Sequence, residues 1–348
     1  MRPLRRFGSA RAEQRRSSTP HRRWGLAICV NVVAAIVAAL AFGVWQRAQA
    51  PSRSPSIPHA GGFEVVDDVG FLPKANTQIR AHSEVDGRKI YDVTYTIGPD
   101  HFRAVPEAAA NPDACALLFG DSFTFGDGVK DDESFAAQIV KLSGGRVAVH
   151  NFGVSGWGPH QFLAGLQSGR FQRAVQCRPT DAFFLMIPSL VWRANGVTNP
   201  WDTTGPRYRL GADGRPVRDG RLGDPDPYNW RRWIGLRPVS KGYAKRLAIA
   251  VIAEAMNELK RLYPGIRTHV ILYRVASWID VDFTVDDLVQ LEYDLHEAGL
   301  TPIPLEAIIP HYRFAMQDYI LHPTDFHPNA RAHRLIAEFM LREIESGR

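Results

Sequence analysis

Short apolar runs alternate with longer amphipathic stretches over the last two thirds of the chain. The apolar runs predict β-strands at 116–119, 147–151, 182–187, 269–273 and 301–304. The amphipathic stretches predict helices at 134–142, 159–169, 241–263, 285–298 and 330–346. Strands that are apolar on both faces and alternate with helices are typical of a parallel sheet covered on both sides. We therefore expect an α/β domain, in which ligands bind beyond the carboxyl ends of the strands.

Two regions depart from this alternation. Residues 63–112 contain short alternating runs with Gly and Asp turns, which predicts a small β-rich cap in front of the main domain at 113–348. An irregular insertion at 195–238 carries several Trp and Tyr side chains. Structureless loops of this length are uncommon unless functional or disordered, and aromatic residues argue against disorder. Within the insertion, 207–210 and 216–218 are expected to pair as a hairpin.

The N-terminal segment has the pattern of a membrane anchor. The stretch 25–44 contains no charged side chain, and a helix of that length spans about 30 Å, the thickness of the hydrocarbon core of a bilayer. Eight Arg side chains precede it. The positive-inside rule then predicts a cytoplasmic leader at 1–23, a transmembrane anchor at 24–46 and a Pro/Ser-rich linker at 47–62.

A cleaved signal peptide is the alternative, because Ala48-Gln49-Ala50 fits a small-x-small cleavage pattern. Both interpretations export the body of the protein. We expect a single-pass protein of the cytoplasmic membrane with its N-terminus inside, its contact with the membrane through 24–46 and its main domain in the periplasm or outside the cell.

The net charge of +6 does not indicate nucleic-acid binding. Residues 1–23 hold eight Arg and one Glu, which leaves 34 basic and 35 acidic side chains in the rest of the chain. A nucleic-acid-binding domain needs a basic face for the phosphates, and this body is neutral. With 45% hydrophobic and 22% charged residues, the composition also excludes wholesale disorder and a collagen-like chain.

Cysteine use leaves two possibilities open. Cys115 and Cys177 are the only cysteines in the exported part; they either pair in an oxidising compartment or remain buried free thiols. The chain has neither His-x-x-x-His nor paired Cys-x-x-Cys spacing. We therefore expect no metal and no cofactor.

Three segments carry residues suited to nucleophilic chemistry. Ser122 lies in Phe-Gly-Asp-Ser-Phe-Thr-Phe-Gly directly after the first predicted strand, where its hydroxyl would project from the sheet; a simple helix cap is the alternative. Asp325 and His327 precede the last helix and could supply a base and its orienting carboxylate. His322 and His333 are equally eligible by composition.

The third segment follows the second predicted strand and reads Asn-Phe-Gly-Val-Ser-Gly-Trp-Gly-Pro from residue 151. Glycine-rich turns expose backbone amides, and the transition state of acyl transfer needs such donors for its oxyanion. A plain turn before a helix is the alternative.

Together these segments resemble the motifs of the SGNH/GDSL hydrolases, over roughly Leu117 to Glu345. The resemblance is greatest to the membrane-anchored or exported bacterial branch associated with exopolysaccharide and envelope acyl chemistry. It implies a flavodoxin-like three-layer α/β/α fold with about five parallel strands. It also implies that Ser122 is the nucleophile, His327 the general base and Asp325 its orienter, and that the amides of Ser122 and Gly156 form the oxyanion hole.

Two features depart from the family pattern. The family often has Gly-x-Asn-Asp after the third strand, and its Asn donates to the oxyanion; here the sequence is Ile-Pro-Ser-Leu. Ser189 or Asn195 could replace that donor. The spacing of Asp325 and His327 is one residue shorter than the family's commoner Asp-x-x-His.

The resemblance implies a serine esterase that acts on acyl esters, with O-acyl groups on envelope or exported polysaccharide as the expected substrate. The alternatives are an O-acyltransferase with the same triad and a non-catalytic glycan-binding subunit of an export or modification complex. Partners would then be an acylated carbohydrate or another ester substrate, together with envelope polysaccharide machinery. Candidate substrate-binding residues are Trp157, Trp201, Trp230 and Trp233.

Overall fold

The computed structural model describes residues 28, 30–35, 37–38, 61–197, 201–225, 239–273 and 283–347. The chain divides into two compact units, Met1–Ser52 and Arg53–Arg348. Within the first unit the described residues are helical. Most of the predicted anchor at 24–46 lies outside the described residues, and among the helices that are described none has the length and apolarity needed to cross a membrane.

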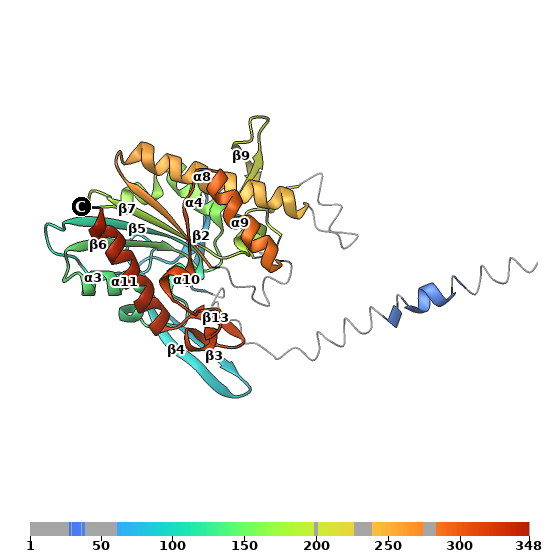
Figure 1. Cartoon of the computed structure of the whole chain (residues 1–348), viewed down its shortest axis with the longest axis horizontal. Coiled ribbons are helices and arrows are strands. Elements are labelled where there is room, and N and C mark those ends of the chain that lie inside the picture. Colours follow the sequence, from blue (N-terminus) through green and yellow to red (C-terminus); the bar gives the residue numbers. More distant parts are fainter. Residues whose placement is uncertain are drawn as a thin grey trace, which may run out of the picture. The chain divides into compact units, whose positions relative to one another are not determined.

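A five-stranded parallel sheet forms the centre of the second unit (Figure 1). Its strands are β5 (Ala114–Gly120), β6 (Val147–Gly153), β7 (Asp181–Met186), β10 (Arg267–Leu272) and β11 (Pro302–Pro304). The order β11-β10-β7-β5-β6 corresponds to the flavodoxin-like arrangement. All five strands lie where the apolar runs predict them.

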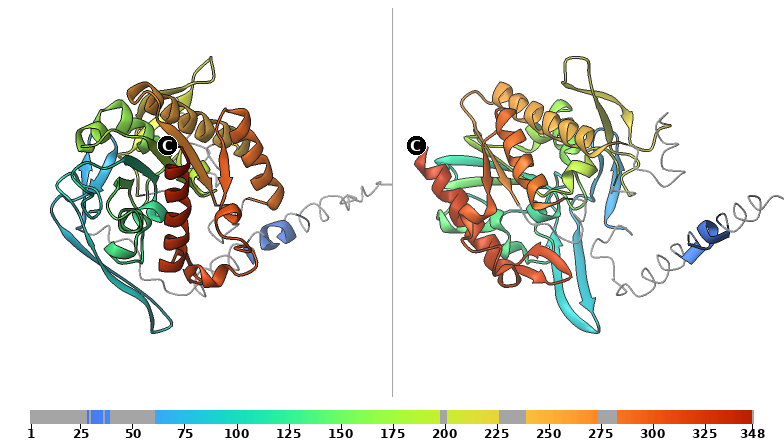
Figure 2. Two further views of the ribbon diagram at one scale, coloured as in Figure 1. Left: turned by 60° about the vertical axis from the view of Figure 1, so that its left-hand side comes forward. Right: turned by 45° about the vertical axis from the view of Figure 1, so that its right-hand side comes forward.

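Helices cover both faces of this sheet, so the unit has three α/β/α layers (Figures 1 and 2). On one face α3 (Phe135–Leu142) packs against α11 (Ala330–Ser346), and α4 (Pro159–Gln167), α8 (Lys241–Leu262) and α9 (Val285–Glu297) cover the other. The shorter helices are α2 (Ser122–Phe125), α5 (Arg170–Ala174), α6 (Leu190–Arg193) and α10 (Leu305–Ile308), with 3-10 turns η1 (Asp131–Glu133) and η3 (Met316–Asp318). The five predicted helices are confirmed to within two residues at each end.

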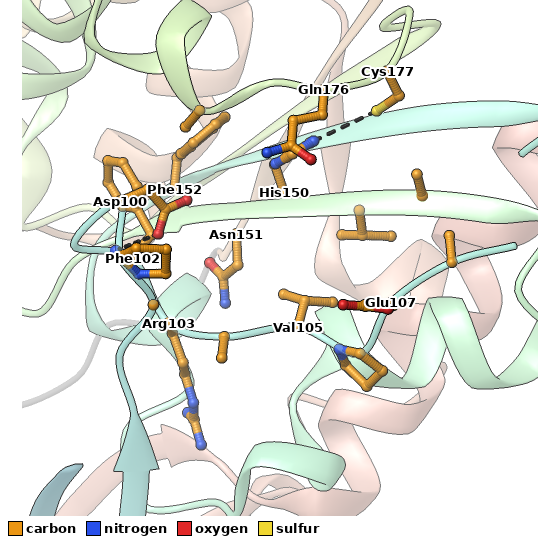
Figure 3. Close-up of a pocket in the computed structure, with 18 of the residues that line it drawn as sticks. Asp100, Phe102, Arg103, Val105, Glu107, His150, Asn151, Phe152, Gln176 and Cys177 are labelled. Atoms are coloured by element: carbon orange, nitrogen blue, oxygen red, sulfur yellow. Dashed lines mark hydrogen bonds between the residues drawn. The ribbon is translucent and has the colours of Figure 1, made fainter. Parts of the chain in front are cut away.

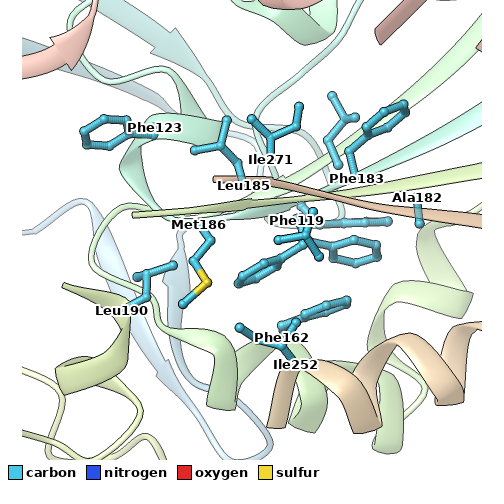
Figure 4. Packing of buried hydrophobic residues seen from close by; sticks show 14 of the residues in the cluster. Phe119, Phe123, Phe162, Ala182, Phe183, Leu185, Met186, Leu190, Ile252 and Ile271 are labelled. Carbon is cyan, nitrogen blue, oxygen red and sulfur yellow. The ribbon is translucent and has the colours of Figure 1, made fainter. Parts of the chain in front are cut away.

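Aromatic side chains on β5, β7 and α4 pack these two strands against their covering helix (Figure 4). The ring of Phe119 stacks on that of Phe162 with 4.2 Å between centroids, and Phe162 stacks in turn on Phe184 at 5.3 Å. All three rings are buried, and burial of each side chain contributes about 1.5 to 3 kcal/mol. The carboxyl end of β5 is therefore held in a rigid position.

The remaining strands form four antiparallel pairs: β1 (Phe63–Val66) with β2 (Gly70–Pro73), β3 (Gln78–Val85) with β4 (Arg88–Thr96), β8 (Pro206–Leu210) with β9 (Pro216–Arg221), and β12 (Ile320–His322) with β13 (Asp325–Pro328). The β8–β9 pair is the hairpin expected in the insertion. The segment of the predicted β-rich cap contains β1–β4. Phe71 and Leu72 on β2 belong to the main hydrophobic core, whereas the β3–β4 pair packs with Phe125 in a second cluster.

Cys115 and Cys177 are joined. A disulfide links Cys115 on β5 to Cys177 in the loop before β7, with their Cα atoms 6.0 Å apart. The structure thereby selects the paired form from the two possibilities that the sequence left open.

Arg103, in the segment after β4, holds the loop that follows α2. Its guanidinium is fully buried and donates to the carbonyls of Phe125, Gly126 and Val129 at 2.6 to 2.8 Å. Its Nε donates to Asp131 Oδ1 at 3.0 Å. One side chain therefore supplies the hydrogen-bond donors for three backbone carbonyls of this loop.

Replacing Arg103 with Met should lower the free energy of unfolding by about 3 kcal/mol, because it leaves buried carbonyls and a carboxylate without their donor. Urea unfolding followed by circular dichroism measures this change. Arg80→Met is the matched control, since Arg80 on β3 makes an exposed ion pair with Asp92, and it should behave as wild type. Equal stability of the two variants would contradict the assignment of Arg103.

Candidate active site

The turn after β5 places Ser122 at the start of α2. Gly120 has a φ of +154°, and Asp121 caps α2 by accepting a hydrogen bond from the N–H of Phe123 at 3.0 Å. Ser122 is thus the first residue of the helix and not its cap, and its hydroxyl is not occupied by capping.

A buried arginine fixes the capping aspartate. Arg193 on α6 donates from Nη1 to Asp121 Oδ2 at 2.9 Å and to the carbonyl of Trp157 at 3.0 Å. The sequence pattern does not identify Arg193, because both of its partners lie on other loops. Arg193 connects the three loops that follow β5, β6 and β7.

The hairpin of β12 and β13 brings the acidic and basic residues to the serine. Ser122 Oγ lies 2.8 Å from Nε2 of His327, and Nδ1 of His327 lies 2.6 Å from Asp325 Oδ1. Asp325 also accepts the backbone N–H of His327 at 3.2 Å. The short Asp-x-His spacing is therefore compatible with a Ser–His–Asp arrangement, because both residues lie on one short strand.

The two other eligible histidines serve elsewhere. His322 Nδ1 contacts the hydroxyl of Thr324 at 2.9 Å. His333 is buried on α11, where its Nδ1 accepts the N–H of Phe135 at 3.1 Å. Burial, with the nearby charges of Arg103 and His327, lowers the pKa of His333 to about 3, so this ring remains neutral.

Carboxylates dominate the electrostatics of His327. Burial by itself lowers its pKa, but the charge and hydrogen bond of Asp325, with the charges of Asp127 and Asp121, outweigh burial and raise the pKa to about 9. The ring of Phe123 lies 5.0 Å from the imidazole and restricts it on one side. The site thus favours the imidazolium, the form that results when histidine takes a proton from serine.

Backbone amides available to an oxyanion remain on the loop after β6. The N–H groups of four residues in this loop are occupied: Gly153 donates to Asn151, Val154 to Gly120, Trp157 to Val154 and Gly158 to Gln161. In the described part of the chain no hydrogen bond uses the N–H of Gly156 or Ser122. Gly156 has a φ of +87°, which glycine adopts without strain.

The two candidates for a third donor differ. The prediction of Asn195 as an oxyanion donor is wrong, because its side-chain amide donates to the carbonyls of Val191 and Ala244 at 3.0 and 3.3 Å. Asn195 follows α6, and its side chain contacts α8. The hydroxyl of Ser189 is buried and has no hydrogen-bond partner among the described residues. Ser189 remains the candidate.

The four predicted substrate-binding tryptophans do not share one environment. Trp157 is buried, and its indole donates to the carbonyl of Phe71 at 3.0 Å, so its role is packing and the prediction for it is wrong. Trp201 is 38% exposed and donates to the carbonyl of Gly156 at 3.3 Å. Trp230 and Trp233 lie outside the described residues. Trp201 therefore borders the amide that could bind an oxyanion.

A hollow of about 1010 Å³ lies elsewhere, along β6 and the segment 98–112, and Ser122, Asp325 and His327 do not line it (Figure 3). His150 and Cys177 are among its lining residues, and Nε2 of His150 lies 3.5 Å from Sγ of Cys177. The ligand atoms of Cys115, His150 and Cys177 are within 4.8 Å of one another, but the disulfide leaves no thiolate to bind a metal.

No family model matches the chain, and no curated protein matches it. Similar solved structures include a lipolytic protein of the G-D-S-L family from Veillonella parvula, which is 16% identical, with 66% of this chain and 97% of that chain covered and a TM-score of 0.39. An acetylxylan esterase from Geobacillus stearothermophilus is 15% identical, with 67% and 95% covered and a TM-score of 0.38. A putative arylesterase from Agrobacterium tumefaciens is 11% identical, with 67% and 99% covered and a TM-score of 0.38. Such similarity is too low to assign function, which must come from the geometry of the site.

That geometry fits acyl chemistry. A serine hydroxyl, an imidazole and a carboxylate are joined by hydrogen bonds. The amides of Ser122 and Gly156, which have no hydrogen-bond acceptor among the described residues, follow β5 and β6. This is the set of groups that activates a serine toward a carbonyl carbon and stabilises the resulting oxyanion.

The reactivity of Ser122 toward a fluorophosphonate should rise with pH, about tenfold per unit, and level off near pH 9. The reason is that only neutral His327 can take the proton, and the carboxylates keep it protonated below its raised pKa. Labelling rates from pH 6 to 10, followed by mass spectrometry, test this expectation. A rate that is already constant above pH 7 would contradict the raised pKa of His327.

Proposed function

We propose that this protein is a serine esterase that cleaves acyl esters through an acyl-serine intermediate, with O-acyl groups of an exported or envelope polysaccharide as substrate. The observation that carries the proposal is the chain of hydrogen bonds from Ser122 through His327 to Asp325, at 2.8 and 2.6 Å. The disulfide between Cys115 and Cys177 supports export, because such bonds persist in oxidising compartments.

In the first half of the reaction, Ser122 Oγ attacks the ester carbonyl carbon while His327 Nε2 takes the hydroxyl proton. The carbonyl oxygen becomes an oxyanion and is bound by the amides of Ser122 and Gly156. The intermediate then collapses, and the leaving alcohol takes the proton from the imidazolium. An acyl-serine remains.

In the second half, His327 takes a proton from water, which attacks the acyl carbon. The second tetrahedral intermediate collapses, the carboxylic acid leaves and Ser122 Oγ recovers its proton from the imidazolium. Throughout, Asp325 keeps its charge and holds the ring in the tautomer that presents Nε2 to the serine. A sugar hydroxyl in place of water would complete an O-acyl transfer with the same residues.

The full-length protein should hydrolyse a short-chain aryl ester and be labelled by a fluorophosphonate at Ser122. Ser122→Ala should abolish labelling and lower kcat by at least about a thousandfold, because the nucleophile is lost. Ser346→Ala at the exposed end of α11, which retains Ser122, should be labelled as wild type is. Peptide mapping of the labelled protein identifies the site.

Labelling that persists in Ser122→Ala would overturn the assignment of the nucleophile. Product analysis by mass spectrometry with an added glycan acceptor distinguishes the alternatives: an acyl group gained by the glycan indicates transferase activity. Polysaccharide binding without labelling or turnover would indicate a non-catalytic glycan-binding subunit.

Trp201 should contribute to recognition of a sugar ring, because its partly exposed indole lies beside Gly156 and aromatic faces stack on sugars. Trp201→Ala should raise KM for an acetylated oligosaccharide by roughly three- to tenfold and affect a small aryl ester less. Trp201→Phe keeps a ring without the hydrogen bond to Gly156 and should recover most of the loss. Tyr293→Ala, on the exposed side of α9, is the control, and an equal effect on both substrates would contradict the role.

A further inference from the structure

Asp127 is a buried acidic residue next to the candidate active site that the Ser–His–Asp arrangement does not use. It lies between Gly126 and Gly128 directly after α2, and it is 3% exposed. Its N–H donates to the carbonyl of Ser122 at 3.0 Å. The side chain therefore begins one helical turn from the nucleophile.

One oxygen of this carboxylate holds the loop that carries Gly156. The hydroxyl of Ser155 donates to Asp127 Oδ1 at 2.7 Å, and Ser155 immediately precedes Gly156. On its other side, Gly156 accepts the indole hydrogen bond of Trp201 at 3.3 Å. Asp127 thus holds the side chain of the residue before Gly156, and Trp201 holds the carbonyl of Gly156 itself. These two contacts restrain the chain on both sides of the N–H of Gly156.

The second oxygen, Oδ2, is buried and has no hydrogen-bond partner within the described part of the chain. A buried carboxylate oxygen without a partner is costly unless another charge compensates for it. The titratable and charged groups that act on Asp127 are His327 and Asp325 from β13, Arg103 after β4 and Tyr95 on β4. His327 and Arg103 are the two that stabilise its charge.

We propose that Asp127 is a positioning residue with two effects: through Ser155 it fixes the amide of Gly156, and through its negative charge it stabilises the imidazolium of His327. The proposal rests on the esterase function proposed above. A single buried carboxylate then acts both on the amide that binds the oxyanion and on the histidine that takes the proton.

The ionisation of Asp127 is consistent with both effects. Burial raises its pKa to about 6, although the charges of His327 and Arg103 and the hydrogen bond from Ser155 act in the opposite direction. The carboxylate is therefore charged above about pH 6, where His327 still carries its proton. Its charge is one of the causes that raise the pKa of His327.

The test compares Asp127→Asn and Ser155→Ala in the full-length protein, with Asp132→Asn as control because Asp132 is exposed in the same region. The rate of fluorophosphonate labelling is measured from pH 6 to 10, and the pKa of His327 is measured by NMR. Asp127→Asn should shift the midpoint of the pH profile of labelling down by roughly one pH unit. It should also lower the plateau, which is the labelling rate at high pH, about tenfold. Ser155→Ala should lower the plateau by a similar factor without shifting the midpoint, since the charge remains.

Asp132→Asn should change neither quantity. If Asp127→Asn leaves the midpoint and the pKa of His327 at their wild-type values, the electrostatic effect is refuted; if Ser155→Ala leaves the plateau unchanged, the anchoring effect is refuted. Should Asp127→Asn not fold, Asp127→Glu is the alternative, because it keeps the charge on a longer side chain. It should lower the plateau of the labelling rate without shifting the midpoint of the pH profile. The NMR measurement needs no turnover, so it tests Asp127 even if wild type is not labelled and the esterase proposal fails.

Discussion

The hydrogen bond between Ser122 and His327 joins residues 205 positions apart, and most of the architecture serves to keep their two side chains aligned. Ser122 is held by β5, which lies between β6 and β7 in the sheet. His327 is held by β13, where Asn329 caps α11 and also donates to the carbonyl of Ile320 at 3.1 Å. Because a misplacement of about 1 Å can reduce reactivity a hundredfold, the packing of α11 on α3 is a condition of the chemistry.

A second constraint is the concentration of charge around one imidazole. Asp325, Asp127 and Asp121 all raise the pKa of His327, and such a group of buried carboxylates needs positive partners. Arg193 pairs with Asp121, and the charge of Arg103 acts on Asp127. The arrangement makes His327 a strong base, which favours removal of the serine proton, but it also keeps the base protonated until the solution is alkaline. The same charges therefore set both the driving force and the pH range of the reaction.

The sequence predicts those features that depend on local pattern. Strand and helix positions follow from runs of apolar and amphipathic residues, and the Ser, Gly and Asp/His segments stand at the ends of those elements. Arg193 was missed because its function depends on Asp121, 72 positions away, and no local pattern records such a contact. Asn195 and Trp157 were assigned wrongly for a related reason: position at the end of a strand does not fix the direction of a side chain, and here α6 and the core determine it. The β12–β13 hairpin is too short to show a period.

The insertion and the sheet make separate contributions to the site. Asp202 is fully buried and accepts hydrogen bonds from His160 and Gln161 of α4 at 2.9 and 2.6 Å, which anchors the insertion beside the loop of Gly156. Trp201, the residue before Asp202, therefore contacts that loop from a backbone position that Asp202 holds in place. In the proposed mechanism the nucleophile and the oxyanion amides come from the loops after β5 and β6, and the base comes from β13. None of them lies in the insertion, so changes there can alter which alcohol or sugar fits without altering the acyl chemistry. In the proposed mechanism, the surface around Trp201 selects between water and a hydroxyl group as acyl acceptor, while Ser122, His327 and the carboxylates behind them carry out acylation.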